Sequence, residues 1–268
     1  MGKVGVKIVQ NNFAGSEHIP QKSKSVTLTV SLKLEVNNIK KAFGGLQAVN
    51  DVSFSISRGS VTGLIGPNGS GKTTLFSCIT KLLKPDSGTV FFNGQRVDHL
   101  SSFKIARKGI RRTFQEVRLF KELTVMENMG IAAMGARVHG WEEKAGASLE
   151  RMGVLEKREA KCITLSVGQQ KLVELAMCLM VESDFIMLDE PVAGVNPVIE
   201  DRILQQIQEC KAEGKTFLVI EHDIPFIMGI SDAIIVLHLG QKLAEGKPSE
   251  IQENDQVLHA YLGRSHRQ

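Results

Sequence analysis

One glycine-rich loop constrains the fold of this chain more than any other feature. Residues 66–73 read Gly-Pro-Asn-Gly-Ser-Gly-Lys-Thr and match the pattern G-x-x-x-x-G-K-[ST] at every fixed position. The apolar run Val61–Ile65 precedes the loop, and the helix-like segment Thr73–Leu83 follows it. A strand, a glycine-rich loop and a helix in this order predict an α/β core that binds a phosphate group.

The residue types of the loop suit that chemistry. Its glycines let the backbone curl, so that several amide groups face one point at a helix N-terminus, where the helix dipole favours an anion. Lys72 would neutralise charge on the outer phosphates, and the Thr73 hydroxyl would ligate Mg²⁺. The alternative, a chance glycine-rich turn, does not explain the flanking strand and helix. The residues expected to bind nucleotide here are Gly66, Pro67, Asn68, Gly69, Ser70, Gly71, Lys72, Thr73 and Thr74.

Two acidic residues follow a second apolar run. Phe185–Leu188 leads directly into Asp189 and Glu190. Ligands of open parallel sheets lie beyond the carboxyl ends of the strands. Because neighbouring strand residues point to opposite faces, the two acids should differ in role. We expect Asp189 to hold Mg²⁺ through water and Glu190 to polarise the attacking water. The alternative is that Glu190 only caps the next segment.

Apolar patterning indicates how the rest of the chain is organised. Alternation from Val26 to Val36 predicts a half-buried strand, and the run Phe217–Ile220 predicts a central parallel strand. A helix over residues 198–213, ending at Gly214, would connect Phe185–Leu188 to that strand by a right-handed crossover. Residues 1–24 are polar and predict a mobile leader. Residues 25–268 would form the nucleotide-binding domain, with a helical subdomain at about 116–183.

Composition narrows the possible partners. The charge is 33 − 29 = +4, which is too small an excess to argue for nucleic acid. The four cysteines form no C-x-x-C pair and predict buried, reduced thiols. No apolar run reaches the roughly 18 residues that a spanning helix needs, and the N-terminus lacks the apolar region of a signal peptide. We expect a cytoplasmic protein whose membrane role comes through partners, and a basic run from Lys104 to Arg112 that forms a solvated face.

Several further motifs resemble those of the ATP-binding cassette (ABC) ATPases. Residues 165–169, Leu-Ser-Val-Gly-Gln, are similar to the signature L-S-G-G-Q of that family. Gln115 resembles its Q-loop glutamine, Asn196 lies where its D-loop falls, and His222 resembles its switch histidine. Phe43 resembles the aromatic residue on which adenine stacks. The resemblance covers the chain from about Leu34 to Gly263.

Within the family, the chain looks most like the ATPases of branched-chain amino acid transporters. The similar stretches are Phe43-Gly44-Gly45-Leu46, Arg112-Thr113-Phe114-Gln115, Ala193-Gly194-Val195-Asn196-Pro197 and Ala260-Tyr261-Leu262-Gly263. Three features depart from the common family pattern. Val167 replaces the first signature glycine and Asn196 replaces an aspartate, both as this branch tends to have. The segment 129–165 is shorter than in the branch.

The resemblance implies an α/β P-loop NTPase fold with an antiparallel β portion and an inserted helical subdomain. It also implies a head-to-tail dimer, in which each ATP is held between the phosphate loop of one chain and Ser166, Gly168 and Gln169 of the other. Glu190, His222 and Gln115 would be catalytic, and Thr73, Gln115 and Asp189 would hold Mg²⁺. The alternatives are that Ser166 only caps a helix, that His222 is structural, that Gln115 is a surface amide, and that Phe43 belongs to the core.

The function that the resemblance implies is an ATPase subunit on the inner face of the cell membrane. With a second ATPase subunit it would energise a separate permease, which imports branched-chain amino acids delivered by a solute-binding protein. One alternative is a soluble cassette ATPase that acts on DNA or ribosomes. Another is a regulatory nucleotide-binding module, for which Val167 is the only hint.

Overall fold

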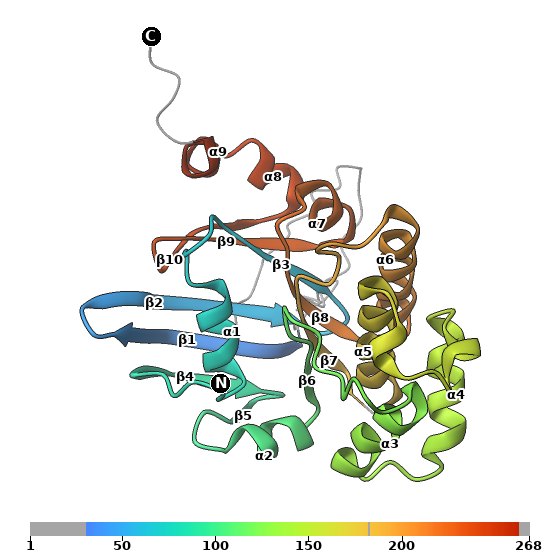
Figure 1. The fold of residues 1–268 in the computed structure, drawn as a ribbon. Coiled ribbons are helices and arrows are strands. Elements are labelled where there is room, and N and C mark those ends of the chain that lie inside the picture. The colour runs from blue at the N-terminus through green and yellow to red at the C-terminus, as the bar shows by residue number, and fades with distance from the viewer. Residues whose placement is uncertain (1–30, 182, 263–268) are drawn as a thin grey trace, which may run out of the picture. The chain divides into compact units, whose positions relative to one another are not determined.

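Two β-sheets form the framework of the computed structural model, which describes residues 31–181 and 183–262 (Figure 1). The predicted leader, residues 1–24, and the start of the predicted strand, residues 25–30, lie outside the described residues. The first sheet is antiparallel, with strand order β2-β1-β4-β5. Its strands are β1 (Leu32–Phe43), β2 (Leu46–Ser57), β4 (Ser87–Phe92) and β5 (Gln95–Arg96).

The second sheet carries the phosphate loop. Its strand order is β10-β9-β3-β8-β7-β6, and every neighbouring pair is parallel except β9 and β10. Its strands are β3 (Val61–Ile65), β6 (Ile110–Arg112), β7 (Phe185–Asp189), β8 (Thr216–Ile220), β9 (Ala233–His238) and β10 (Gln241–Gly246). Three of the predicted strands, β3, β7 and β8, are adjacent, whereas β9 and β10 were not predicted from the sequence.

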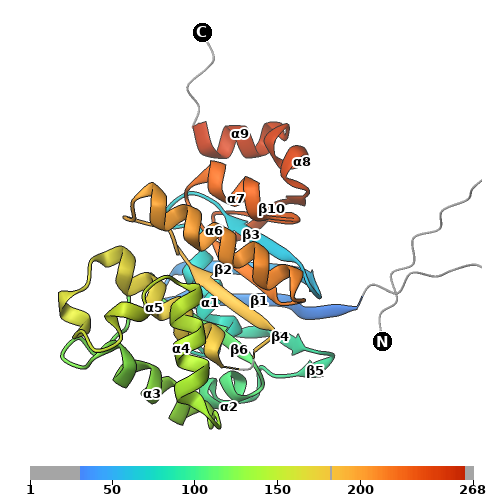
Figure 2. The same cartoon turned by 90° about the vertical axis from the view of Figure 1, so that its right-hand side faces the viewer.

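The helices cover this second sheet on both faces (Figures 1 and 2). They are α1 (Lys72–Ile79), α2 (Ser102–Arg107), α3 (Val125–Ala136), α4 (Trp141–Arg151), α5 (Val167–Met180), α6 (Pro197–Ala212), α7 (Ile224–Ile230), α8 (Pro248–Gln252) and α9 (Asp255–Leu262), with 3₁₀ turns at Leu155–Lys157 and Cys162–Thr164. Helix α1 ends four residues before the predicted Leu83, and α6 matches its predicted range within one residue. None of the helices in the described part of the chain is both long and apolar enough to span a bilayer.

Alternation along the central strands divides the interior into two cores. Phe185 and Met187 of β7 pack with α1 and the antiparallel sheet. Ile186 and Leu188, the residues between them, pack with the helices on the other face. Because successive side chains point to opposite faces, a strand buried on both sides reads as a continuous apolar run. By the same alternation Asp189 shares the face of Met187, the face that α1 covers.

Helices α3, α4 and α5 lie between β6 and β7 in the sequence and gather beside the sheets (Figure 2). Thr124 begins α3 and Ser166 begins α5, each with a capping box. The predicted α/β fold with an antiparallel β portion and inserted helices is thus confirmed. The boundaries 116–183 for a helical subdomain remain a prediction. All four cysteines are buried and unpaired, as expected.

Candidate nucleotide site

The phosphate loop leaves β3 and turns into α1 through residues with positive φ angles. Gly66, Gly69 and Gly71 have φ values of 152°, 77° and 102°. A Cβ atom at Gly66 would lie 2.1 Å from the carbonyl oxygen of Leu237, and one at Gly71 would lie 2.3 Å from that of Ala48. Glycine is therefore required both by conformation and by space, since another residue would displace the loop from its neighbours.

Lys72 is folded back over this loop. Its Nζ donates to the carbonyl oxygens of Gly66, at 2.7 Å, and Pro67, at 3.1 Å. Burial lowers the pKa of Lys72, while the nearby Glu190 and Asp189 carboxylates act in the opposite direction. Both acids therefore lie close enough to the lysine to share one site with it.

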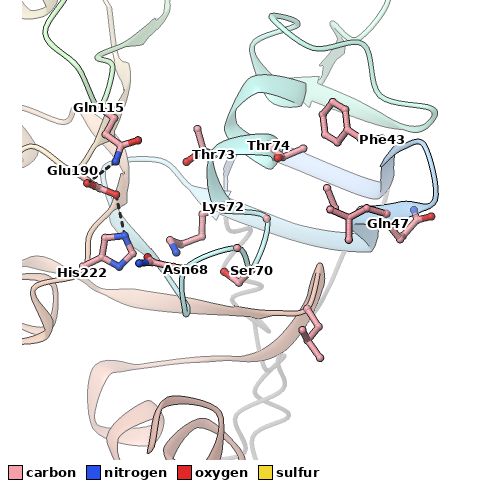
Figure 3. A pocket seen from close by; sticks show the side chains of 15 residues that line it. Phe43, Gln47, Asn68, Ser70, Lys72, Thr73, Thr74, Gln115, Glu190 and His222 are labelled. Carbon is pink, nitrogen blue, oxygen red and sulfur yellow. Dashed lines mark hydrogen bonds and ion pairs between the residues drawn. The ribbon is translucent and has the colours of Figure 1, made fainter. Parts of the chain in front are cut away.

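A cleft of about 720 Å³ opens in front of the loop (Figure 3). Phe43 lies at one end of it with 47% of its surface exposed, and the loop and α1 form its floor. The structure brings the following predicted residues into its wall: Phe43, Asn68, Gly69, Ser70, Gly71, Lys72, Thr73, Thr74, Gln115, Glu190 and His222. The lining residues do not include the other predicted site residues, which are Gly66, Pro67, Asp189, Ser166, Gly168 and Gln169.

Three predicted catalytic residues meet at one carboxylate (Figure 3). Nε2 of His222 lies 2.9 Å from Oε1 of Glu190, within ion-pair distance, and Oε2 accepts a hydrogen bond from Nε2 of Gln115 at 3.1 Å. Each residue follows the carboxyl end of a different parallel strand, β7, β8 or β6. Glu190 has a φ of 52°, and its amide donates to the carbonyl oxygen of Ile220. Such an arrangement can orient the carboxylate toward a molecule held in the cleft.

Asp189 is buried behind Glu190 with 1% of its side chain exposed. Oδ2 accepts a hydrogen bond from Arg112 at 2.8 Å, whereas Oδ1 is buried without a hydrogen-bond partner among the described residues. Burial raises the pKa of Asp189, and Arg112 opposes that rise. The expectation that the basic run forms a solvated face holds for Lys104, Arg107 and Lys108, which are exposed, but is wrong for Arg111, whose Nε is buried, and for Arg112.

Two buried charges near the cleft were missed by the sequence reasoning. Nζ of Lys171, on α5, donates to the backbone oxygen of Glu190 at 2.6 Å. Glu221 accepts hydrogen bonds from the amides of Val192, at 2.8 Å, and His222, at 2.9 Å. Burial lowers the pKa of Lys171 and raises that of Glu221. Glu221 directly precedes His222 in the sequence, which is the only signal that could have pointed to it.

The Ser166 end of α5 is an exposed, self-capped helix terminus. The Ser166 hydroxyl accepts from the Gln169 amide at 3.2 Å, and the Ser166 amide donates to Oε1 of Gln169 at 3.0 Å. Val167 beside them is 56% exposed. Gly168 packs on α6, where an added Cβ would lie 3.1 Å from Ile199. None of these four residues lines the cleft of the same chain.

The site fits a nucleotide carrying a divalent cation. The loop amides and Lys72 suit a phosphate chain, and the unpaired Oδ1 of Asp189 and the hydroxyl of Thr73 are oxygen ligands of the kind that Mg²⁺ takes. Fold and site together define a P-loop nucleotide-binding protein.

Comparisons with known proteins identify the family to which this P-loop protein belongs. Residues 49–193 match the family described as ABC transporter, and residues 241–267 match the branched-chain amino acid ATP-binding cassette transporter family. The chain is 40% identical over 250 residues to the high-affinity branched-chain amino acid transport ATP-binding protein LivG of Salmonella typhimurium, covering 87% of this chain and 98% of the relative. The chain belongs to the ABC transporter family, in its branched-chain amino acid ATP-binding cassette group, as the sequence motifs indicated.

Solved structures agree with this assignment. An ATP-binding cassette of an ABC transporter in its ADP conformation has a TM-score of 0.79 and 36% sequence identity, over 87% of this chain and 99% of that chain. A dimeric cassette in a post-hydrolysis state, bound to ADP and phosphate, has a TM-score of 0.74 and 28% identity, over 80% of this chain and 98% of that chain. As a member of this family, the chain is a nucleotide-binding ATPase of a transporter.

Proposed function

We propose that this chain binds and hydrolyses MgATP to energise the import of branched-chain amino acids through a separate permease. The observation that carries the proposal is the Glu190 carboxylate, held between His222 and Gln115 at the mouth of the phosphate-loop cleft. The substrate class rests on LivG, whose name gives branched-chain amino acid transport. The site would lie on the inner face of the membrane, where ATP is available.

Different residues of the cleft would bind different parts of MgATP. The loop amides and Lys72 would hold the phosphates, and Phe43 would stack on the adenine. Thr73, Asp189 and Gln115 would hold Mg²⁺, which when bound neutralises charge on the phosphates. Glu190 would accept a proton from the attacking water, and His222 would keep the carboxylate and the outer phosphate aligned. Catalysis would come mainly from positioning, as is general in phosphoryl transfer.

A second copy, or a related ATPase subunit, would complete the site. Its Ser166, Gly168 and Gln169 would meet the outer phosphate, because a helix N-terminus is suited to an anion. Nucleotide that touches both chains favours the closed pair, and loss of the outer phosphate on hydrolysis removes that preference. The permease would convert closing and opening into access from alternate sides of the membrane.

The proposal is tested with the purified protein and with the transporter. Binding of a fluorescent ATP analogue and release of phosphate are measured with and without Mg²⁺, first for the chain alone and then with the co-purified permease in liposomes. We expect Mg²⁺-dependent turnover that drives uptake of leucine when the solute-binding protein is added. Absence of nucleotide binding, or uptake that is indifferent to ATP, would reject it.

A further inference from the structure

Arg112 does not line the cleft, but its guanidinium contacts Asp189 of the proposed nucleotide site. It is the last residue of β6, and 8% of its side chain is exposed. Its guanidinium lies between two aromatic rings, with Cζ 5.4 Å from the ring centre of Phe76 and 5.2 Å from that of Phe114. Both distances are within the range of cation–π contacts. These two contacts restrict the positions that the guanidinium can take.

The two ends of the guanidinium reach two different elements. NH2 donates to Oδ2 of Asp189 at 2.8 Å, and NH1 donates to the hydroxyl of Ser77, on α1, at 3.1 Å. The Ser77 hydroxyl in turn donates to the carbonyl oxygen of Thr73 at 2.8 Å. One side chain therefore connects Asp189, behind the cleft, to the first turn of the helix that begins at the phosphate loop.

We propose that Arg112 is a positioning residue that sets Asp189 and Thr73 at a fixed separation for the divalent cation. By occupying Oδ2 it leaves Oδ1 of Asp189 as the oxygen for the cation, and Oδ1 is the atom that lacks a partner. Without the guanidinium, the terminal torsion of the carboxylate is free over a broad range, so that the oxygen facing the site would lose its fixed direction. This inference rests on the proposed nucleotide site and assigns a role to a residue outside it.

Charge repulsion and positioning predict opposite changes in cation affinity when Arg112 is replaced. A positive guanidinium close to Asp189 also repels a cation, so that its removal would strengthen cation binding if charge alone mattered. Positioning predicts the reverse. Arg112→Met keeps an unbranched stem beside Phe76 and Phe114 but removes all three donors, the third being Nε, which donates to the carbonyl oxygen of Thr113 at 3.2 Å. Arg112→Lys keeps the charge without the planar fork that spans Ser77 and Asp189.

The experiment measures Mn²⁺ binding by electron paramagnetic resonance, with and without ATP, alongside binding of a fluorescent ATP analogue in EDTA. For Arg112→Met we expect about tenfold weaker Mn²⁺ binding in the presence of ATP, equivalent to about 1.4 kcal/mol. The metal-free nucleotide affinity should stay within twofold. Arg112→Lys should fall between this variant and the parent. Arg118→Ala is the matched control, since Arg118 stacks on Phe114 at 3.8 Å but has no bond to Asp189.

The outcomes separate this inference from the proposed function. Mn²⁺ affinity that is unchanged or increased in Arg112→Met overturns the positioning role, and so does an Arg112→Lys variant that behaves like the parent. Absence of nucleotide binding by the parent protein, both with and without the divalent cation, would instead reject the proposed function. If Arg112→Met does not fold, judged by its thermal melt, Arg112→Lys decides the matter by the same measurement.

Discussion

Helices α1 and α5 of this chain present N-termini that are built differently. The residue before α1 is Gly71, with no side-chain cap, and the helix begins with Lys72 and Thr73. The residue before α5 is Ser166, whose hydroxyl already accepts from the amide of Gln169, and the first turn of α5 contains no exposed cation. The first terminus is equipped to hold an anion by itself, whereas the second has part of its binding capacity occupied. Under the proposed function, α1 would supply the principal half of a nucleotide site and α5 the accessory half.

The largest effect should come from the carboxylate of Glu190, which lines the same cleft as the first turn of α1. Glu190→Gln keeps the shape of the side chain but removes the base, so turnover should fall about a thousandfold. Binding of ATP should remain, because the loop amides and Lys72 are untouched. Phosphate release and binding of a fluorescent ATP analogue measure the two quantities separately. Turnover equal to that of the parent would remove Glu190 from the role of base.

Nucleotide binding at the N-terminus of α1 should depend on Lys72. Lys72→Ala deletes the buried ammonium and should weaken ATP binding by about 2–5 kcal/mol, the range seen when one partner of a buried charge pair is truncated. Lys84→Ala, an exposed lysine shortly after the same helix, is the matched control and should bind like the parent. Titration with fluorescent ATP compares them. Equal ATP affinities of Lys72→Ala and Lys84→Ala would mean that Lys72 does not contribute to nucleotide binding at the start of α1.

The two helices also differ in the charges that they bury, and this should appear in the pH dependence of stability. Burial raises the pKa of Glu174, on α5, from 4.5 to about 7. Between these values the folded chain binds a proton that the unfolded chain does not, so the stabilisation is complete below pH 4.5 and is lost as the pH rises through 7. The whole change amounts to about 3 kcal/mol.

Glu174→Gln should remove this pH dependence, and Glu143→Gln, an exposed substitution on α4, should leave it in place. Urea unfolding at pH 4.5, 6 and 8 gives the comparison. If the free energies of unfolding of parent and Glu174→Gln run parallel over this range, then α5 does not bury a protonated acid at neutral pH.

The smallest effect should distinguish binding from capping on α5. Ser166→Ala and Thr124→Ala each delete the hydroxyl of a capping box and should each cost about 1 kcal/mol in the free energy of unfolding. Only Ser166→Ala should also lower the ATPase rate of the assembled transporter. Denaturant unfolding and phosphate release measure both. Equal ATPase rates in the two variants would show that Ser166 caps α5 and has no role in hydrolysis.

The sequence predicts much of the fold because its main signals are local. The loop at residues 66–73 and the apolar runs of β3, β7 and β8 each identify an element without reference to distant residues. Arg112 could not be placed in this way. It occupies a strand of three residues, and its burial depends on Phe76 and Asp189, far away in the chain.

The same reason explains the two buried charges that were missed. Lys171 looks like any lysine on a helix until α5 packs behind β7, where its Nζ reaches the backbone of Glu190. Glu221 follows an apolar run, as Asp189 does, yet its partners are the backbone amides of Val192 and His222. Residue type and spacing carry no information about such long-range contacts.

The left-handed backbone at Glu190, with φ at 52°, has a consequence for how this protein could change over generations. A residue with a Cβ in this conformation costs about 1–2 kcal/mol relative to the right-handed region, whereas glycine adopts it freely. If Glu190 is needed only for hydrolysis, a related protein that no longer hydrolyses ATP would therefore be more stable with glycine at this position. Retention of glutamate at this position in a lineage would itself report that hydrolysis is still under selection.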